Sequence, residues 1–514
     1  MDFVQQHRDV VMGSLSGFDR LRFRGSLRWL SCAGGMGKYL NAIGVRLKDF
    51  DGYVNKVTGW IREASQRIAT LAGRPLQYLA SSGIDKQERA EALAQQDGIQ
   101  EGLICVLKCV EPCWSFGIGR DGNGHIQVRR MYRKCSYYYF YWIDPQMGLM
   151  HLRLQSWFPF AIHVCLNGRE WLCRQLERTE AGYLRRENCL VQVADLGQAQ
   201  RLLNEQLKTD WSKRLNALVE QFHPVHRQLF PLKPYYWALE QSEWATDVMF
   251  QAPKHLAQLY PRLLQHSMQN LGCREILRFL GRRLTATGGI QGHFRGQVTA
   301  DLRERPEGIR VKYRVNDNSI KMYDKQGSVL RIETTINDPR DIKVFREGPD
   351  GRGHWERLRK GTADLHRRAE VSQAANERYL ESLATVEDRT PLGDLTRELC
   401  RRVRWKGQPV RGLNPLGQED ARLLETVGRG EFLLTGFRNR DLVRLLHGDS
   451  RVSRAEQRRR SGAVTRKIRL LRAHGLIHKV SGSYRYKLSP AGQRTIAALL
   501  SARAADTKKL MDAA

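Results

Sequence analysis

The sequence lacks long apolar runs, and this absence excludes the simplest membrane architecture. A helix that spans a bilayer needs about 20 consecutive apolar residues, and the apolar runs of this 514-residue chain are all much shorter. The first residues, Met-Asp-Phe-Val-Gln-Gln-His-Arg, also lack the apolar core of a secretory signal peptide. We therefore expect a cytoplasmic protein without a membrane partner.

Close cysteine pairs are also missing. The chain has ten cysteines but no Cys-x-x-Cys spacing, which disfavours the common zinc sites. Cys105, Cys109 and Cys113 follow one another at intervals of four and would share one face of a helix. Without an export signal we expect reduced thiols, and the alternative to a metal site at these three cysteines is a place in the core.

Acidic residues are few relative to basic ones. The chain has 54 Asp and Glu against 85 Lys and Arg, a formal net charge of +31, while 41% hydrophobic residues supply ample core material. Such an excess of positive charge favours a polyanionic partner, because binding to phosphates releases counterions. The charge predicts a nucleic-acid partner, with DNA favoured and RNA possible. The alternative is a basic, solvated surface.

A phosphate-binding loop is absent as well. Gly117, Gly119, Gly122 and Gly124 interrupt the chain, but no Gly-Lys-Ser/Thr follows them. Glycines at this density, with Arg120-Asp121 between them, indicate a loop or a hairpin.

What is present predicts an α+β protein of about three domains. Helical periodicity at 50–76 and 86–96 indicates a mainly helical N-terminal region. The predicted organisation has four parts: a helical region at 1–115, a central α+β domain at 116–350, a charged helical connector at 351–400, and a winged helix-turn-helix domain at 401–514.

The central domain alternates between strand and helix patterns. Aromatic and alternating segments predict strands at 137–144, 149–158, 161–166, 309–315, 319–325 and 328–336. Apolar residues at helical spacing predict helices at 194–218, 235–250 and 275–284. One face of the aromatic strand Tyr137–Trp142 is expected in the core. The other face is left open to base stacking.

The C-terminal part concentrates the positive charge. Residues 401–514 contain 26 Lys and Arg against 9 Asp and Glu. Three helices, a short hairpin and a last helix are predicted in that order. The run Arg466-Lys-Ile-Arg-Leu-Leu-Arg-Ala-His-Gly-Leu-Ile477 resembles the recognition helix and wing entry of the winged-helix superfamily.

That resemblance implies a third helix in the major groove and a wing on the backbone or minor groove. The predicted nucleic-acid-binding residues are Arg458, Arg459, Thr465, Arg466, Arg469, Arg472, Arg485 and Lys487. The alternative is a winged helix that contacts another protein.

Two further resemblances concern the rest of the chain. A large bacterial family of basic hypothetical proteins resembles this chain in segments 138–144, 148–160, 167–172, 243–247 and 320–335. That family has no assigned activity, so the resemblance adds no function. The segment from Tyr323-Asp-Lys to Leu330-Arg-Ile-Glu333 is similar to one in some rolling-circle replication initiators and relaxases. That likeness implies Tyr323 as a nucleophile beside a metal ion. Those enzymes usually carry a His-hydrophobe-His motif, which Gly292-His293-Phe294-Arg295 does not match.

Four isolated carboxylates in this basic protein are candidate catalytic residues: Asp144, Glu243, Asp247 and Glu333. Phosphodiester cleavage commonly uses metal ions held by carboxylates. An Asp on a first strand, followed by acidic residues later in the sequence, is typical of ribonuclease-H-like nucleases. We expect Asp144 and Glu333 to bind magnesium if the protein is a nuclease. The alternatives are turn chemistry at Asp144 and ion pairs at the other three.

The sequence therefore leaves three hypotheses. The first is a DNA-processing protein of a mobile element or replication system; if catalytic, it is a metal-dependent endonuclease or nicking enzyme. The second is a non-catalytic DNA- or RNA-binding regulator. The third is an RNA-guided effector.

Overall fold

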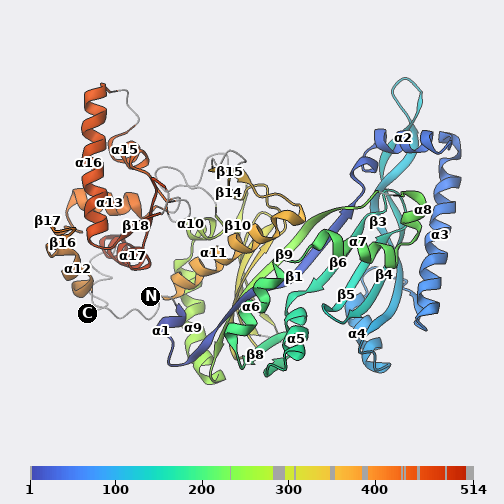
Figure 1. The fold of residues 1–514 in the computed structure, drawn as a ribbon, viewed down its shortest axis with the longest axis horizontal. Helices are drawn as coiled ribbons and strands as arrows, with labels where there is room; N and C mark the ends of the chain where they lie inside the picture. The colour runs from blue at the N-terminus through green and yellow to red at the C-terminus, as the bar shows by residue number, and fades with distance from the viewer. Residues whose placement is uncertain are drawn as a thin grey trace. The chain divides into compact units, whose positions relative to one another are not determined.

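The computed structural model describes residues 3–504 apart from 232, 282–295, 306–307, 348–352, 385–391, 430–431, 433–435, 449–451 and 481–482. The fold mixes helices and strands (Figure 1). The helices are α1 (Phe3–Gln6), α2 (Ala33–Ala42), α3 (Phe50–Leu71), α4 (Lys86–Gln96), α5 (Gly168–Arg178), α6 (Leu196–Gln206), α7 (Trp211–Phe222), α8 (Val225–Leu229), α9 (Pro253–Asn270), α10 (Cys273–Phe279), α11 (Leu365–Ala384), α12 (Leu392–Cys400), α13 (Gln418–Val427), α15 (Asn439–His447), α16 (Arg454–Ala473) and α17 (Pro490–Ala504).

The strands are β1 (Val11–Ser26), β2 (Leu76–Tyr78), β3 (Gly102–Arg120), β4 (Ile126–Asp144), β5 (Gly148–Gln155), β6 (Ile162–Asn167), β7 (Tyr183–Arg186), β8 (Cys189–Val193), β9 (Tyr236–Phe250), β10 (Val298–Arg305), β11 (Gly308–Val315), β12 (Asn318–Lys325), β13 (Val329–Ile336), β14 (Lys343–Glu347), β15 (Gly353–Arg357), β16 (Val403–Trp405), β17 (Gln408–Val410), β18 (Ile477–Lys479) and β19 (Tyr486–Leu488). Among the described helices, none is long and apolar enough to cross a membrane.

One large sheet dominates the described part of the chain. Eleven strands are hydrogen-bonded in the order β10-β11-β12-β13-β9-β1-β6-β5-β4-β3-β2. The chain divides into two compact units, each discontinuous in sequence. Unit 1 comprises Met1–Gly13, Phe250–Ile332 and Ala374–Ala514, and unit 2 comprises Ser14–Met249 and Glu333–Gln373.

The N-terminal region is not helical throughout. Helices α3 and α4 confirm two of its predicted helices, but β1 is a strand of 16 residues and β3 begins within the same region. Leu21 and Phe23 of β1 are buried, whereas Arg22 between them is half-buried and the flanking Arg20 and Arg24 are exposed. This alternation with period two is the signature of a strand with one covered face.

The predicted helix at 235–250 is wrong, because these residues form strand β9. β9 lies between β13 and β1, and its last seven residues, from Trp244 to Phe250, are all buried. In a strand buried on both faces, polar and apolar residues do not alternate at period two. Its apolar residues therefore match a helical pattern as well as a strand pattern.

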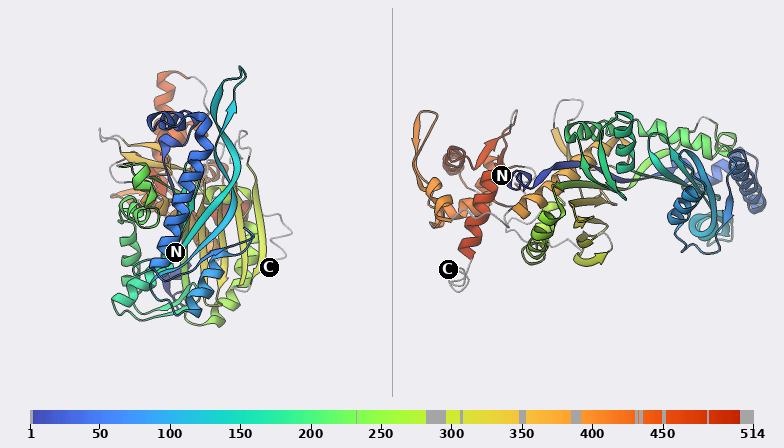
Figure 2. Two further views of the ribbon diagram at one scale, coloured as in Figure 1. Left: turned by 90° about the vertical axis from the view of Figure 1, so that its right-hand side faces the viewer. Right: turned by 90° about the horizontal axis from the view of Figure 1, so that it is seen from below.

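Strands β3 and β4 form a long antiparallel hairpin in unit 2. Its turn contains Gly122 and Gly124, so the predicted hairpin is confirmed, and its tip projects beyond α2 and α3 (Figures 1 and 2). Cys105, Cys109 and Cys113 lie on β3 and not on a helix. All three are buried, because odd positions of a strand share a face as readily as every fourth position of a helix.

The predicted connector and linker are both ordered elements. α11 does not lead away from the core, because Arg368 and Tyr379 on it are fully buried. Within unit 2, Arg368 donates to the backbone oxygens of Leu239 and Ile336 at 3.1 and 3.3 Å. The basic segment at 401–415, predicted as a linker, contains the hairpin β16–β17.

The C-terminal residues have their own hydrophobic core. Leu424 of α13, Leu442 of α15 and Ile468 of α16 pack together with Leu488 of β19. The order of elements is α13, α15, α16, the hairpin β18–β19 and α17. The helices and the hairpin predicted for this part are therefore confirmed as elements.

Candidate metal centre and nucleic-acid interface

Three carboxylates lie on three neighbouring strands of unit 2. Asp19 is on β1, Glu243 on β9 and Glu333 on β13, and β9 lies between the other two strands. One carboxylate oxygen from each residue lies within 4.8 Å of the other two. Because neighbouring strands run about 4.8 Å apart, the three side chains project from the same face at the same level of the sheet.

The alignment of β1 with β9 explains why Asp19 meets Glu243. Cross-strand contacts join the two strands on both sides of this level: Ser16 Oγ to Thr246 Oγ1 at 3.0 Å, and Arg22 Nε to Glu240 Oε2 at 3.0 Å. Both contacts fit an antiparallel pair that brings Asp19 near Glu243, as the distance between their carboxylate oxygens shows. Like charges in that position are destabilising unless positive charge lies nearby.

Positive charge is present beside the three carboxylates. Asp19 and Glu333 are buried, with 7% and 1% of their surface exposed, and Glu243 is half-buried. Partial desolvation lowers the pKa of Arg20, but Glu243, followed by Cys165, Asp19 and Glu333, raises it, and the net pKa lies above its ordinary value. The carboxylates therefore act on a neighbouring cation as a concentrated negative charge.

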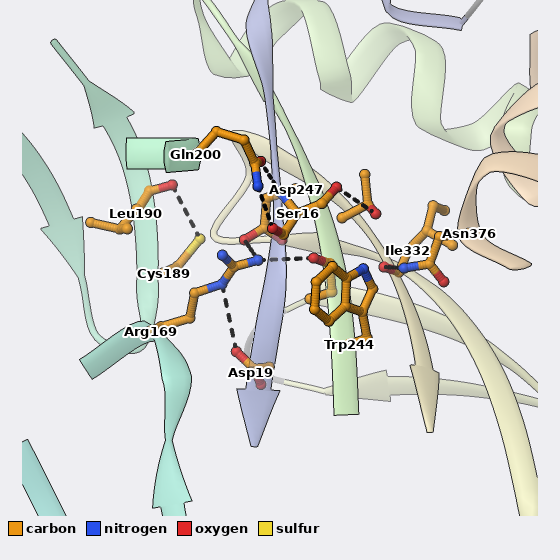
Figure 3. A network of polar contacts seen from close by, with 12 residues as sticks. Ser16, Asp19, Arg169, Cys189, Leu190, Gln200, Trp244, Asp247, Ile332 and Asn376 are labelled. Atoms are coloured by element: carbon orange, nitrogen blue, oxygen red, sulfur yellow. Dashed lines mark hydrogen bonds and ion pairs between the residues drawn. The ribbon is translucent and has the colours of Figure 1, made fainter. Parts of the chain in front are cut away.

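Arg169 supplies a second cation from α5 (Figure 3). The helix begins there because the Asn167 side chain accepts the backbone N–H groups of Arg169 and Glu170. The Arg169 guanidinium is almost completely buried. Its Nη2 lies 3.0 Å from Asp247 Oδ2, and its Nε lies 4.0 Å from Asp19 Oδ1. Arg169 thus lies between Asp247 and Asp19, one of the three carboxylates.

The group has the donor chemistry of a hard divalent cation. Mg²⁺ and Ca²⁺ prefer carboxylate oxygens at about 2.0–2.6 Å, so ligands on opposite sides of the ion are about 4–5 Å apart. The oxygens of Asp19, Glu243 and Glu333 lie within that span. These three residues could therefore hold one such ion, and we name them the carboxylate triad.

Asp144 lies far from the triad, which corrects the expected pairing of Asp144 with Glu333. β4 is separated from β13 by β5, β6, β1 and β9, which is five strand spacings or about 24 Å. Asp144 Oδ1 accepts the backbone N–H groups of Gln146 and Met147 at 2.8 and 2.9 Å and lies 3.1 Å from Arg214. The alternative of turn chemistry describes its position.

Glu243 and Asp247 share a face of β9, not of a helix. Four residues along a strand span about 13 Å, so the two carboxylates cannot bind the same ion. Glu243 joins Glu333, whereas Asp247 pairs with Arg169. The ion-pair alternative therefore holds for Asp247.

Tyr323 is on β12 in unit 1. It is half-buried, lies opposite Arg310 of β11, and its ring centroid is 6.0 Å from the Arg331 guanidinium carbon. The segment 292–295, which does not match a His-hydrophobe-His motif, lies outside the described residues.

Asp19 is the member of the triad that sequence reasoning missed. It directly precedes Arg20-Leu-Arg-Phe-Arg24, where charged and apolar residues alternate, and it takes the position of an apolar residue in that pattern. That alternation is a strand signal, and a carboxylate within it, flanked by apolar residues on the same face, needs a partner.

The aromatic strand is core on both faces, so it offers no base-stacking surface. Every residue from Tyr137 to Trp142 has less than 9% of its surface exposed. Tyr139 donates a hydrogen bond of 2.7 Å to Glu111, which also lies 2.6 Å from Arg153. Burial raises the pKa of Glu111, but hydrogen bonds from Cys109, Tyr139 and Arg153 lower it to about 2.

The eight predicted nucleic-acid-binding residues fall into two groups. Four are exposed: Arg458, Arg459, Thr465 and Arg466. Arg459 lies 2.8 Å from Glu456. In the described part of the chain, Arg458 and Arg466 have no acidic partner within 4.0 Å. α16 therefore presents the guanidinium groups of Arg458 and Arg466 without a compensating carboxylate among the described residues.

The other four predicted residues are half-buried. The guanidinium carbons of Arg469 and Arg472 lie 6.0 and 5.0 Å from the ring centroid of Trp405 on β16. Arg485 donates to the backbone oxygen of Gly436 at 3.4 Å, and Lys487 is on β19. The hairpin β16–β17 thus packs against the C-terminal turns of α16.

Comparisons with known proteins add no family. No family model matches the chain, and no curated protein is similar to it. A solved structure, the di-domain ARO/CYC BexL from the BE-7585A biosynthetic pathway, covers 55% of this chain and 99% of its own. The identity is 10% and the TM-score is 0.16, which is too low to indicate a shared fold.

Proposed function

We propose that this protein is a DNA-processing protein that cleaves a phosphodiester bond with a divalent cation, magnesium or manganese, held by the carboxylate triad. The observation that carries the proposal is the convergence of Asp19, Glu243 and Glu333 within 4.8 Å on three neighbouring strands of a protein with a net charge of +31.

Each residue around the triad has a role in this chemistry. A bound divalent cation polarises a phosphate oxygen and lowers the pKa of a bound water. Asp19, Glu243 and Glu333 would hold and orient the ion, and Arg169 would fix the Asp19 side of the site through its charge. In hydrolysis, the water oxygen bonds to phosphorus as the bond to the leaving sugar oxygen breaks, and a proton passes to that oxygen.

The C-terminal residues are proposed to be a winged helix that contacts the DNA. Support comes from the order α13, α15, α16, β18–β19 and α17, from the separate core, and from the exposed Arg458 and Arg466. In winged helices the third helix enters the major groove and the hairpin approaches the backbone. Target choice would then reside in this module and cleavage in unit 2.

The test is strand cleavage by the full-length protein. Supercoiled plasmid and circular single-stranded DNA are incubated with Mg²⁺, with Mn²⁺ or with EDTA. We expect cleavage only with a metal ion. Asp19→Asn, Glu243→Gln and Glu333→Gln should each lower the rate roughly 100-fold or more, because each removes a ligand charge.

Asp144→Asn is the matched control, because it neutralises another carboxylate, about 24 Å away. It should cleave within about threefold of the wild type if the triad performs the chemistry. Equal activity of Glu333→Gln and wild type would overturn the proposal. So would the absence of cleavage by wild-type protein that binds DNA, which would favour a non-catalytic regulator.

Tyr323 remains a prediction from the resemblance to replication initiators. Attack by Tyr323 would leave the protein covalently joined to a DNA phosphate, whereas attack by water would not. Denaturing gels of the cleavage reaction, with wild type and with Tyr323→Phe, separate these two nucleophiles.

A further inference from the structure

The distal half of the β3–β4 hairpin carries an unusual combination of exposed side chains. Trp114 and Tyr132 have 55% and 62% of their surface exposed, although large aromatic residues are normally buried. They are direct cross-strand partners in the antiparallel pair. Their ring centroids are 5.3 Å apart and their planes meet at 61°.

Basic residues surround this aromatic pair on the same face. Alternate positions of β4 place Arg130, Tyr132 and Lys134 on one face, and all three are exposed. The Arg130 guanidinium carbon lies 5.0 Å from the ring centroid of Trp114. We name Trp114, Arg130, Tyr132 and Lys134 the hairpin surface.

The two acidic residues nearest in sequence to the hairpin surface do not compensate it. Glu111 belongs to the other face and is held by Arg153 at 2.6 Å. Asp121 lies in the turn, where it accepts the backbone N–H groups of Asn123 and His125 at 2.9 Å. The surface therefore joins exposed aromatic rings to uncompensated positive charge.

We infer that the hairpin surface binds single-stranded DNA by stacking unpaired bases on Trp114 and Tyr132. Aromatic side chains stack on bases of any sequence, and nearby Arg and Lys neutralise the phosphates. A duplex keeps its bases stacked on one another, so exposed rings favour a single strand. The inference rests on the proposed function for its ligand class, and it assigns the substrate strand to a surface of unit 2.

The test is binding of a fluorescent 20-nucleotide oligo-dT to the full-length protein in EDTA, measured by anisotropy. EDTA separates binding from any metal-dependent cleavage. The double variant Trp114→Ala, Tyr132→Ala should weaken binding about tenfold or more, because each base stacked on an aromatic ring contributes about 1–3 kcal/mol to binding. Trp114→Phe with Tyr132→Phe should restore affinity to within about threefold, because phenyl rings also stack.

The matched control is Phe345→Ala, which removes a similarly exposed aromatic residue from another hairpin of unit 2, β14–β15. Its affinity should equal that of the wild type. The inference is overturned if the double alanine variant binds oligo-dT as tightly as wild type, or if wild type binds only duplex DNA or only RNA. If the double alanine variant loses oligo-dT binding and the wild type never cleaves DNA, the hairpin surface is supported and the triad's proposed chemistry is contradicted.

Discussion

At the scale of a single residue, His223 makes the stability of unit 2 sensitive to acid. The side chain follows α7, is 1% exposed, and neither ring nitrogen has a hydrogen-bond partner in the described part of the chain. Its ring lies 5.9 Å from those of Phe160 and His226. Burial, followed by the charge of His226, lowers the pKa of His223 to about 3.

The sign of the effect follows from the unfolded state. Unfolded histidine has a pKa of about 6.5, so below pH 6.5 the unfolded chain takes up a proton that the folded chain refuses. Stability contributed by neutral His223 is therefore lost as the pH falls from about 6.5 towards 3. We expect the loss to be about 2 kcal/mol at pH 5.

His223→Phe should remove this contribution, because a phenyl ring fills the same apolar site without titrating. Urea denaturation at pH 7.5 and pH 5.0, followed by tryptophan fluorescence, measures it. The free energy of unfolding of the variant should fall by about 2 kcal/mol less than that of wild type between the two pH values. Identical pH dependence of the two proteins would contradict the assignment.

At the scale of elements, α16 carries the prediction for the C-terminal module. Arg458 and Arg466 are exposed and have no acidic partner in the described part of the chain. If they contact phosphates, each substitution by alanine should weaken duplex DNA binding at every sequence. Each should also reduce the slope of log affinity against log salt by about one.

Arg397→Ala is the control, because this exposed residue of α12 already pairs with Asp394 at 2.9 Å. Anisotropy titrations of a DNA duplex at several salt concentrations give the slope for each variant. A slope unchanged in Arg458→Ala and Arg466→Ala would mean that α16 faces a partner other than the DNA backbone.

Some helices and strands could be predicted from local sequence patterns, and others could not. Local signals correctly predicted α4, whose Asp85 cap accepts two backbone N–H groups, and the strands β11, β12 and β13, whose apolar residues alternate. β9 was misread because burial on both faces removes the alternation. α11 was misread because Arg368, although charged, lies in the core and satisfies backbone oxygens.

At the scale of the whole molecule, the carboxylate triad depends on pairing between distant segments. Glu243 and Glu333 were predicted as acidic residues needing a partner, but Asp19 lies more than 200 positions earlier in the sequence. Only the β13-β9-β1 order brings the three together. Local patterns carry no information about that order, and the same limit explains why Asp144 was wrongly paired with Glu333.

The most direct test of the account is Mn²⁺ binding to the full-length protein, followed by electron paramagnetic resonance of the free ion. Wild type should bind about one Mn²⁺, displaced by Mg²⁺, with affinity weakened roughly tenfold or more in Glu333→Gln and Asp19→Asn. Asp144→Asn should bind as wild type does. No Mn²⁺ binding by wild type, or equal binding by Glu333→Gln, would contradict the claim that Asp19, Glu243 and Glu333 form one cation site.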